Sequence, residues 1–167
     1  MQIQTIKAKI ILLCCILSLT ACLFRSMPSD EDVLAFYNAY TSELNEVVSI
    51  CSSHKKIYHV VSGDDEVKPF GGKAFSTEDK IAIERLRVII ADLAMSSVMC
   101  NRLYSDAYKF RGVSFYLYDD GLFDGKVKGI SFVTPWSLVD SPYLQANIVA
   151  GELKKINDDG WFIFDIK

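Results

Sequence analysis

Apolar residues recur at helical spacing in two stretches of the chain, and each stretch follows a capping signal. Ser29 and Asp32 have the spacing of a capping box, and Ser76 and Asp79 repeat it. The intervals of three and four that follow predict two long helices, the first running to about Cys51. The first apolar stripe consists of Val33, Phe36, Tyr37, Tyr40, Leu44, Val47 and Cys51, and the second of Ala82, Leu86, Ile89, Leu93, Ser97, Cys100 and Tyr104.

Beyond Lys109 the pattern changes to extended segments rich in aromatic and β-branched residues. Asp159-Gly160, between the last two segments, is a strong hairpin signal. Residues 54–75 are predicted to be an irregular connection with one short strand at 57–61. The pattern therefore predicts an α+β fold in which two long helices precede a four-stranded antiparallel meander. The four predicted strands cover residues 112–118, 127–133, 148–156 and 161–166.

The first 22 residues have a different pattern. Lys7 and Lys9 precede the apolar block Ile10–Leu17, and small residues follow it. A basic start, a short apolar block and a small-residue cleavage site are typical of a secretory signal peptide. A membrane span needs about 20 apolar residues, and the run ends too soon for one. We therefore predict a cleaved signal peptide at residues 1–21.

The end of this block, Leu19-Thr20-Ala21-Cys22, resembles the lipobox of bacterial lipoproteins. The resemblance implies that Cys22 receives a diacylglyceryl group on sulfur and becomes the acylated amino terminus after cleavage. Asp after the cysteine tends to retain such proteins in the inner membrane; here the residue is Leu23. We therefore expect a lipid-anchored protein, favouring the outer membrane facing the periplasm, with residues 22–28 as a short tether and 29–167 as one globular domain.

The remaining cysteines are consistent with export. Cys14 and Cys15 leave with the signal peptide, so Cys51 and Cys100 form an even pair in an oxidising compartment. We favour a disulfide between them over two buried free thiols. Because each cysteine is predicted late in its helix, this disulfide requires the two helices to run roughly parallel or to cross.

Composition and charge exclude some functions. The chain has a formal net charge of −3, and losing Lys7 and Lys9 with the signal peptide makes it more acidic. Without a basic stripe we expect no binding to nucleic acid.

The search for catalytic chemistry gives no positive signal. His54 and His59 are five residues apart and match no established ligand spacing, so we expect no metal site. Ser114 and Ser131 each follow glycine by two positions, in similar tetrapeptides whose likeness we attribute to chance within a hairpin. Both serines lack the second glycine of a nucleophile elbow. We predict no catalytic residue, no cofactor and no enzyme activity.

The segment Thr134–Tyr143 is predicted to be a loop stiffened by Pro135 and Pro142. It carries Trp136 and Tyr143, residue types that dominate interface hot spots. In one interpretation Trp136 and Tyr143 bind a partner; in the other, which we favour, Trp136 folds back with Leu138 to cover the core.

Two resemblances concern the domain itself. The opening of the first helix and the closing hairpin are similar to small exported domains with the cone-shaped, nuclear-transport-factor-like fold. The stretch from Lys128 to Ile166 resembles short uncharacterised bacterial lipoproteins. We expect a non-enzymatic binding module at the cell envelope, in a narrower version an immunity-type protein that captures a toxin. The alternatives are an envelope-assembly or structural subunit and, less favoured, a periplasmic enzyme.

Overall fold

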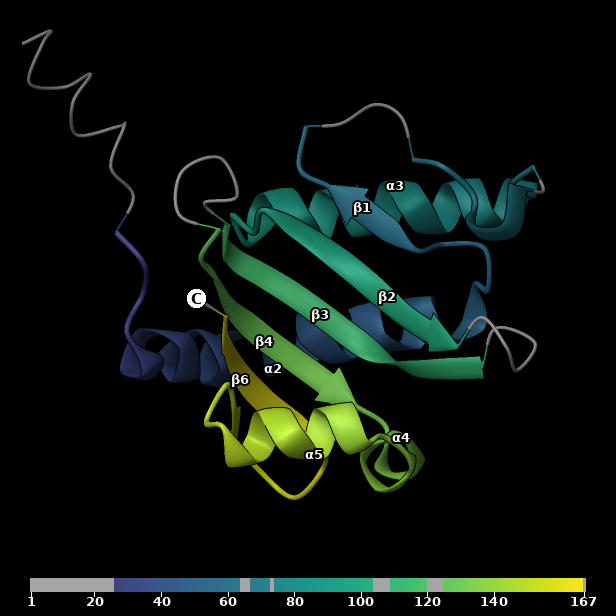
Figure 1. Ribbon diagram of the computed structural model, residues 1–167. Coiled ribbons are helices and arrows are strands. Elements are labelled where there is room, and N and C mark those ends of the chain that lie inside the picture. The colour runs from purple at the N-terminus through teal and green to yellow at the C-terminus, as the bar shows by residue number, and fades with distance from the viewer. Residues whose placement is uncertain (1–25, 64–66, 73, 104–108, 120–124, 167) are drawn as a thin grey trace, which may run out of the picture.

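The computed structural model describes residues 26–63, 67–72, 74–103, 109–119 and 125–166, and these ranges form an α+β fold (Figure 1). This confirms the predicted fold class. The predicted signal peptide 1–21, the lipidation site Cys22 and the tether as far as residue 25 lie outside the described residues.

Both predicted capping boxes are present. Helix α2 (Asp30–Ser53) begins where the Asp32 amide donates to Ser29 Oγ at 3.1 Å and the Ser29 amide donates to the Asp32 carboxylate at 2.9 Å. Helix α3 (Thr77–Asp92) begins with the same pair of bonds between Ser76 and Asp79. In both helices, the capping side chains satisfy amide groups that have no partner within the helix.

The predicted second helix is too long. Helix α3 ends at Asp92, Ala94 takes a left-handed conformation with φ 50°, and residues Ser97–Leu103 form strand β2. Ser97 and Cys100 therefore lie on a strand, and Tyr104 lies outside the described residues. The apolar positions after Leu93 fit a helix as well as a strand, and the turn at residues 93–96 decides between them.

The sheet has six strands in the described ranges, in the order β1-β2-β3-β4-β6-β5, and each neighbouring pair is antiparallel. It therefore includes two strands more than the predicted meander. The strands other than β2 are β1 (His59–Val61), β3 (Lys109–Asp119), β4 (Val127–Val133), β5 (Leu153–Lys155) and β6 (Trp161–Ile166).

The predicted order of the last two strands is wrong. Strand β6 pairs with β4, and β5 lies at the edge beyond β6. The reason is the segment between β4 and β5. Thr134–Tyr143 is not a loop but contains helix α4 (Pro135–Asp140) and the start of helix α5 (Pro142–Val149). Both prolines occupy the first helical turn, where proline is tolerated. The two helices carry the chain past β4 to the edge, so the predicted strand at 148–156 shortens to β5.

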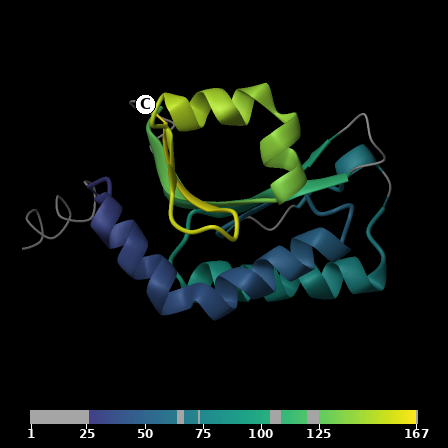
Figure 2. The same cartoon turned by 90° about the horizontal axis from the view of Figure 1, so that it is seen from below.

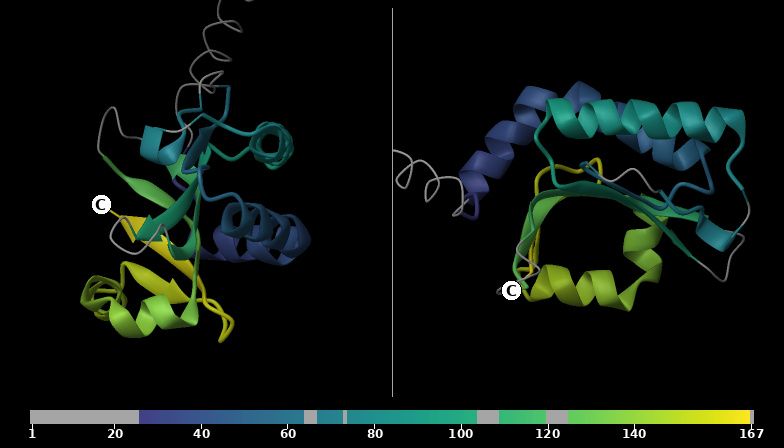
Figure 3. Two further views of the ribbon diagram at one scale, coloured as in Figure 1. Left: turned by 90° about the vertical axis from the view of Figure 1, so that its right-hand side faces the viewer. Right: turned by 90° about the horizontal axis from the view of Figure 1, so that it is seen from above.

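Helices cover both faces of the sheet. Figures 2 and 3 show α2 and α3 on the convex face and α4 and α5 on the concave face. The main core lies between the sheet and α2 and α3, and it includes Phe115, Ile130 and Trp161. A smaller apolar cluster lies on the other face: Val133, Leu153, Phe162 and Phe164, with Leu138 and Leu144 from α4 and α5 packed against it.

Helix α2 bends at Tyr40, where the backbone leaves helical geometry (φ −123°, ψ 23°). The neighbouring Thr41 hydroxyl donates to the Tyr37 carbonyl oxygen at 2.7 Å, a type of bond that often bends helices. The bend lets α2 follow the curved sheet (Figure 2).

Candidate functional site

A cavity of about 350 Å³ lies on the concave side of the sheet, between the strands and helices α4 and α5. This volume is within the usual range of ligand pockets, roughly 300–1,000 Å³. It is lined by Tyr58, Asn101, Arg102, Arg111, Gly112, Ser114, Tyr116, Phe132, Val133, Ser137, Tyr143, Leu144, Asn147, Leu153, Phe164 and Ile166.

The floor of the cavity comes from the pairing of β3 with β4. Their similar tetrapeptides lie opposite each other, so that Ser114 pairs with Ser131. Asn101 on β2 extends this polar strip by donating to Ser114 Oγ at 2.9 Å. Because side chains alternate between the two faces of a strand, these polar groups share the concave face and the apolar residues between them face the core.

Glycine is required in this pairing by the close approach of the backbones. A Cβ on Gly112 would lie 2.0 Å from the Phe132 carbonyl oxygen, and one on Gly129 would lie 1.9 Å from the Phe115 carbonyl oxygen. Gly112 also lines the cavity. No side chain fits at these two positions without moving the strands, so both glycines belong to the construction of the floor.

The roof of the cavity is formed by α4 and α5. Ser137 on α4 is fully buried, and its hydroxyl oxygen accepts a hydrogen bond from Arg111 Nε at 2.9 Å. Ser141 Oγ accepts a hydrogen bond from the Leu144 amide at 3.4 Å and so caps α5. The bond between Ser137 and Arg111 joins the roof to β3.

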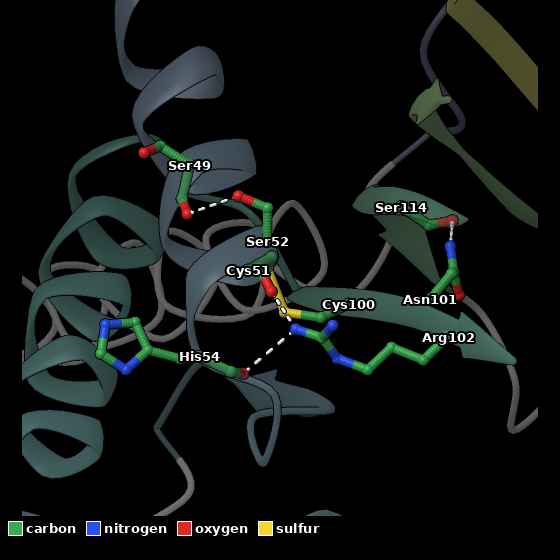
Figure 4. Close-up of a disulfide and its surroundings, with 8 residues drawn as sticks. All are labelled: Ser49, Cys51, Ser52, His54, Cys100, Asn101, Arg102 and Ser114. Carbon is green, nitrogen blue, oxygen red and sulfur yellow. Dashed lines mark hydrogen bonds between the residues drawn. A yellow bond between two sulfur atoms is a disulfide. The ribbon is translucent and has the colours of Figure 1, made fainter. Parts of the chain in front are cut away.

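Among the residues that the structure describes, the charged ones that line the cavity are two arginines, and none of them is Asp or Glu. Arg102 directs its guanidinium to the opposite side of the sheet, where it donates to the carbonyl oxygens of Cys51 and His54 at the end of α2 (Figure 4). Burial lowers the pKa of Arg102. Since the charge of Arg102 serves the carboxyl end of a helix, Arg111 is the described lining residue whose positive charge stays on the cavity side of the sheet.

The two predicted partner-binding residues lie on the roof helices. Tyr143 lines the cavity and is 69% exposed, so it forms part of the rim. Trp136 is half-buried on α4 and does not line the cavity; Lys109 Nζ lies 3.8 Å from the centre of its ring. The structure thus brings Tyr143, but not Trp136, to the cavity.

The predicted cysteine pair lies on the other side of the sheet. The sulfur atoms of Cys51 on α2 and Cys100 on β2 are 2.06 Å apart, the distance of a disulfide (Figure 4). The pairing joins a helix to a strand, so the geometry expected from the sequence, two parallel or crossing helices, is wrong. The bond and Arg102 hold the end of α2 against β2.

The start of α2 is also tied to the sheet. Lys128 on β4 is almost fully buried, and its Nζ lies 2.6 Å from one Asp30 oxygen and 3.6 Å from Asp165. Lys154 on β5 reaches the other Asp30 oxygen at 2.7 Å. Hydrogen bonds from Lys128 and then Lys154 lower the pKa of Asp30. Helix α2 is therefore fixed to the sheet at both ends.

His54 and Asp79 form a pair outside the cavity. Nδ1 of His54 lies 3.1 Å from the Asp79 carboxylate, and Lys56 Nζ lies 3.7 Å from it. Burial raises the pKa of Asp79, but hydrogen bonds from the Ser76 backbone, from His54 and from the Ser76 hydroxyl, together with the Lys56 charge, outweigh burial and lower this pKa to about 2. The carboxylate is thus committed to capping α3.

This pair predicts a loss of stability in acid. A carboxyl group with a lowered folded-state pKa stabilises the fold fully above its unfolded pKa, here 3.8, and loses that contribution as the pH falls toward 2. We expect Asp79→Asn to lower the free energy of unfolding by about 2 kcal/mol at neutral pH and to flatten its pH dependence below pH ~4.

Urea unfolding of both proteins across this pH range measures the effect. Asp32→Asn is the matched control, because Asp32 occupies the same place in the exposed capping box of α2. An acid slope equal in the wild type and Asp79→Asn would contradict the prediction.

Within the described ranges, no group of three or more His, Cys, Asp or Glu side chains could hold a metal ion. The helices of those ranges include none with the length and apolar character of a membrane span.

The residues of the cavity come from five strands, two helices and the connection before β1, and sequence reasoning found only Tyr143 among them. The signal that the sequence analysis attributed to chance is the similarity of the tetrapeptides at 112–115 and 129–132, which places glycine and serine on one face of two neighbouring strands. Arg111, Asn101 and Ser137 had no separate signal.

The fold and the site together define an α+β domain with a cavity between its sheet and two short helices. Comparisons with family models, curated proteins and solved structures give no match for this chain.

Proposed function

We propose that this protein is a lipid-anchored, non-enzymatic binding module of the bacterial cell envelope, and that its binding site is the cavity under α4 and α5. The observation that carries the proposal is the lining of the cavity, which combines apolar walls with Arg111 and neutral hydrogen-bonding groups. The lining residues within the described part of the chain include no His, Cys, Asp or Glu. Such a lining offers binding groups without a general base or an activated nucleophile.

The proposed anchor is Cys22, in the outer membrane and facing the periplasm. Its support is the basic start, the apolar block and the lipobox-like residues 19–22. Three acyl chains on one residue hold a protein at the bilayer far more firmly than the single chain that gives only marginal binding. The tether then joins the domain at α2, whose first residue is bound to two strands by Lys128 and Lys154.

Labelling bacteria with a clickable fatty acid tests the anchor. The wild-type protein is expected to carry the label and to sediment with the membrane fraction, and Cys22→Ser is expected to lose the label. Cys51→Ala serves as the control, because that cysteine lies in the folded domain. Label retained by Cys22→Ser would overturn the assignment.

Site-specific crosslinking tests the binding site. A photoreactive amino acid replaces Tyr143 on the cavity rim in one protein and Val88 on α3, which is 48% exposed on the opposite side, in a control. In irradiated cells we expect crosslinked products from position 143 and none from position 88. Products from position 88 alone, or from neither position, would overturn the proposal.

A second candidate has a protein as its ligand, as in an immunity-type protein or an envelope-assembly subunit. The observation that favours it is the outer surface of α4 and α5, where Val139 is 75% exposed and Val149 is 88% exposed. Both roof helices thus carry an aliphatic side chain that is open to contact with a partner protein. The mass of the product crosslinked at position 143 separates the candidates, because a protein partner shifts the band on a gel and a small ligand does not.

A further inference from the structure

Arg111 differs from other cationic side chains in the structure in what it contacts. Arg85 pairs with Glu46 and Lys128 pairs with Asp30, each at 2.6 Å. Arg111 forms no salt bridge within the described ranges; its Nε donates instead to the neutral hydroxyl of Ser137. A partly buried guanidinium beside an apolar wall is stabilised by an anion.

The bond to Ser137 also determines what Arg111 can still bind. With Nε occupied, the two terminal nitrogens remain, and they form a planar pair of donors. This pair matches the two oxygens of a carboxylate. Because Ser137 is fully buried, its hydroxyl holds the guanidinium in place before a ligand arrives. The arrangement is that of a prepared carboxylate site.

The rest of the lining determines the body of the ligand. Apart from its arginines, the lining is mainly apolar, and this disfavours a sugar or a multiply charged phosphate. The volume of about 350 Å³ equals that of about a dozen liquid water molecules at ~30 Å³ each. A molecule of roughly this size with one charged end fits both observations. The apolar wall consists of Val133, Leu144, Leu153, Phe164 and Ile166.

We propose that the cavity binds a small apolar monocarboxylate, such as a medium-chain fatty acid, with its carboxylate on Arg111 and its apolar body against Leu144, Leu153 and Phe164. This inference rests on the proposed binding function of the cavity and names its ligand class. It predicts that the affinity depends on the charge of the ligand's end group, with a negative group binding most tightly and a positive group least.

Octanoate, octanamide and octylammonium have the same body and differ in that end group. Each is titrated by calorimetry into the full-length lipoprotein in lipid nanodiscs, and heats from empty nanodiscs are subtracted. Octanoate is expected to bind more tightly than octanamide by about tenfold or more, the scale of a charge-assisted hydrogen bond, and octylammonium is expected to bind least. Equal affinity for octanoate and octanamide would overturn the inference.

Four variants test whether Arg111 and the cavity are responsible for this preference. Arg111→Gln is expected to abolish the preference for octanoate over octanamide, and Arg111→Lys to retain part of it. Arg85→Gln, on the opposite side of the sheet, removes the same charge and should change nothing. Asn147→Phe fills the cavity from α5 and should weaken all three ligands, which keeps the test decisive if Arg111→Gln fails to fold. A preference for octanoate that survives Arg111→Gln would overturn the inference.

The experiments distinguish a wrong ligand class from a wrong binding site. If crosslinking succeeds at position 143 while octanoate does not bind in preference to octanamide, the ligand class is wrong and the binding site stands. If neither succeeds, the proposed site is wrong as well.

Discussion

Replacing Cys51 and Cys100 together by alanine is expected to lower the free energy of unfolding by about 4 kcal/mol, the value that chain entropy gives for closing a loop of this length. The two cysteines are 49 residues apart, and the loop between them contains α3 and β1. Both side chains are fully buried, and Arg102 binds the end of α2 beside them. The disulfide therefore reduces the conformational entropy of the unfolded chain, and it holds α2 against the sheet in the folded protein.

Denaturant unfolding with and without reductant measures this effect. The wild type in reductant should resemble the double variant, and the double variant should not respond to reductant. Thiol labelling of the denatured, unreduced protein from an oxidising compartment is the independent check. Two freely alkylated cysteines would contradict the prediction.

Trp161→Ala is expected to cost about 3–5 kcal/mol, the range for removing a large aromatic side chain from a core. Trp161 is 3% exposed, and its ring lies 5.3 Å from Tyr37 on α2 and 5.8 Å from Phe115 on β3, measured between ring centres. It thus packs β6 against both the helix and the neighbouring strands. Thermal or urea unfolding gives the loss directly.

Trp136→Ala is the matched comparison, because it makes the same change at a half-buried position on α4. A smaller loss than at Trp161 is expected, since less apolar surface leaves water there on folding. The same measurement decides between the two interpretations of Trp136. If Trp136 covers the core, its removal lowers the free energy of unfolding; if it binds a partner, its removal weakens binding and leaves stability nearly unchanged. A larger loss at Trp136 than at Trp161 would contradict the assignment of the core.

The parts of the fold that the sequence predicts well depend on local signals. Ser29 with Asp32, Ser76 with Asp79, and the Asp159-Gly160 turn each act within a few residues, and the structure contains all three features. The helix predicted through Cys100 fails because a stripe of apolar residues at spacings of three and four does not exclude a turn at Ala94. The order of β5 and β6 fails because it depends on the path of α4 and α5 across the sheet, which no local pattern determines.

The candidate site was less predictable, for a physical reason. Asn101 and Arg111 meet because β2 pairs with β3, and Ser137 joins them because α4 packs over the concave face of the sheet. Which face each side chain takes depends on strand register, and a shift of one residue reverses the face. Tyr143 could be named from its residue type and its neighbouring prolines, whereas the cationic lining could not.

The position of β6 has a consequence for the order in which the protein acquires its structure. Its residues come after those of every other strand in the sequence, yet β6 lies between β4 and β5 and supplies Trp161 and Ile163 to the main core. Until these residues are available, β4 has an open edge and the core lacks its largest side chain. If the chain is exported from its amino terminus, as the proposed lipid anchor requires, it reaches its native state only after nearly all of it has crossed the membrane. Until β6 has paired, the open edge of β4 is free to pair with other chains.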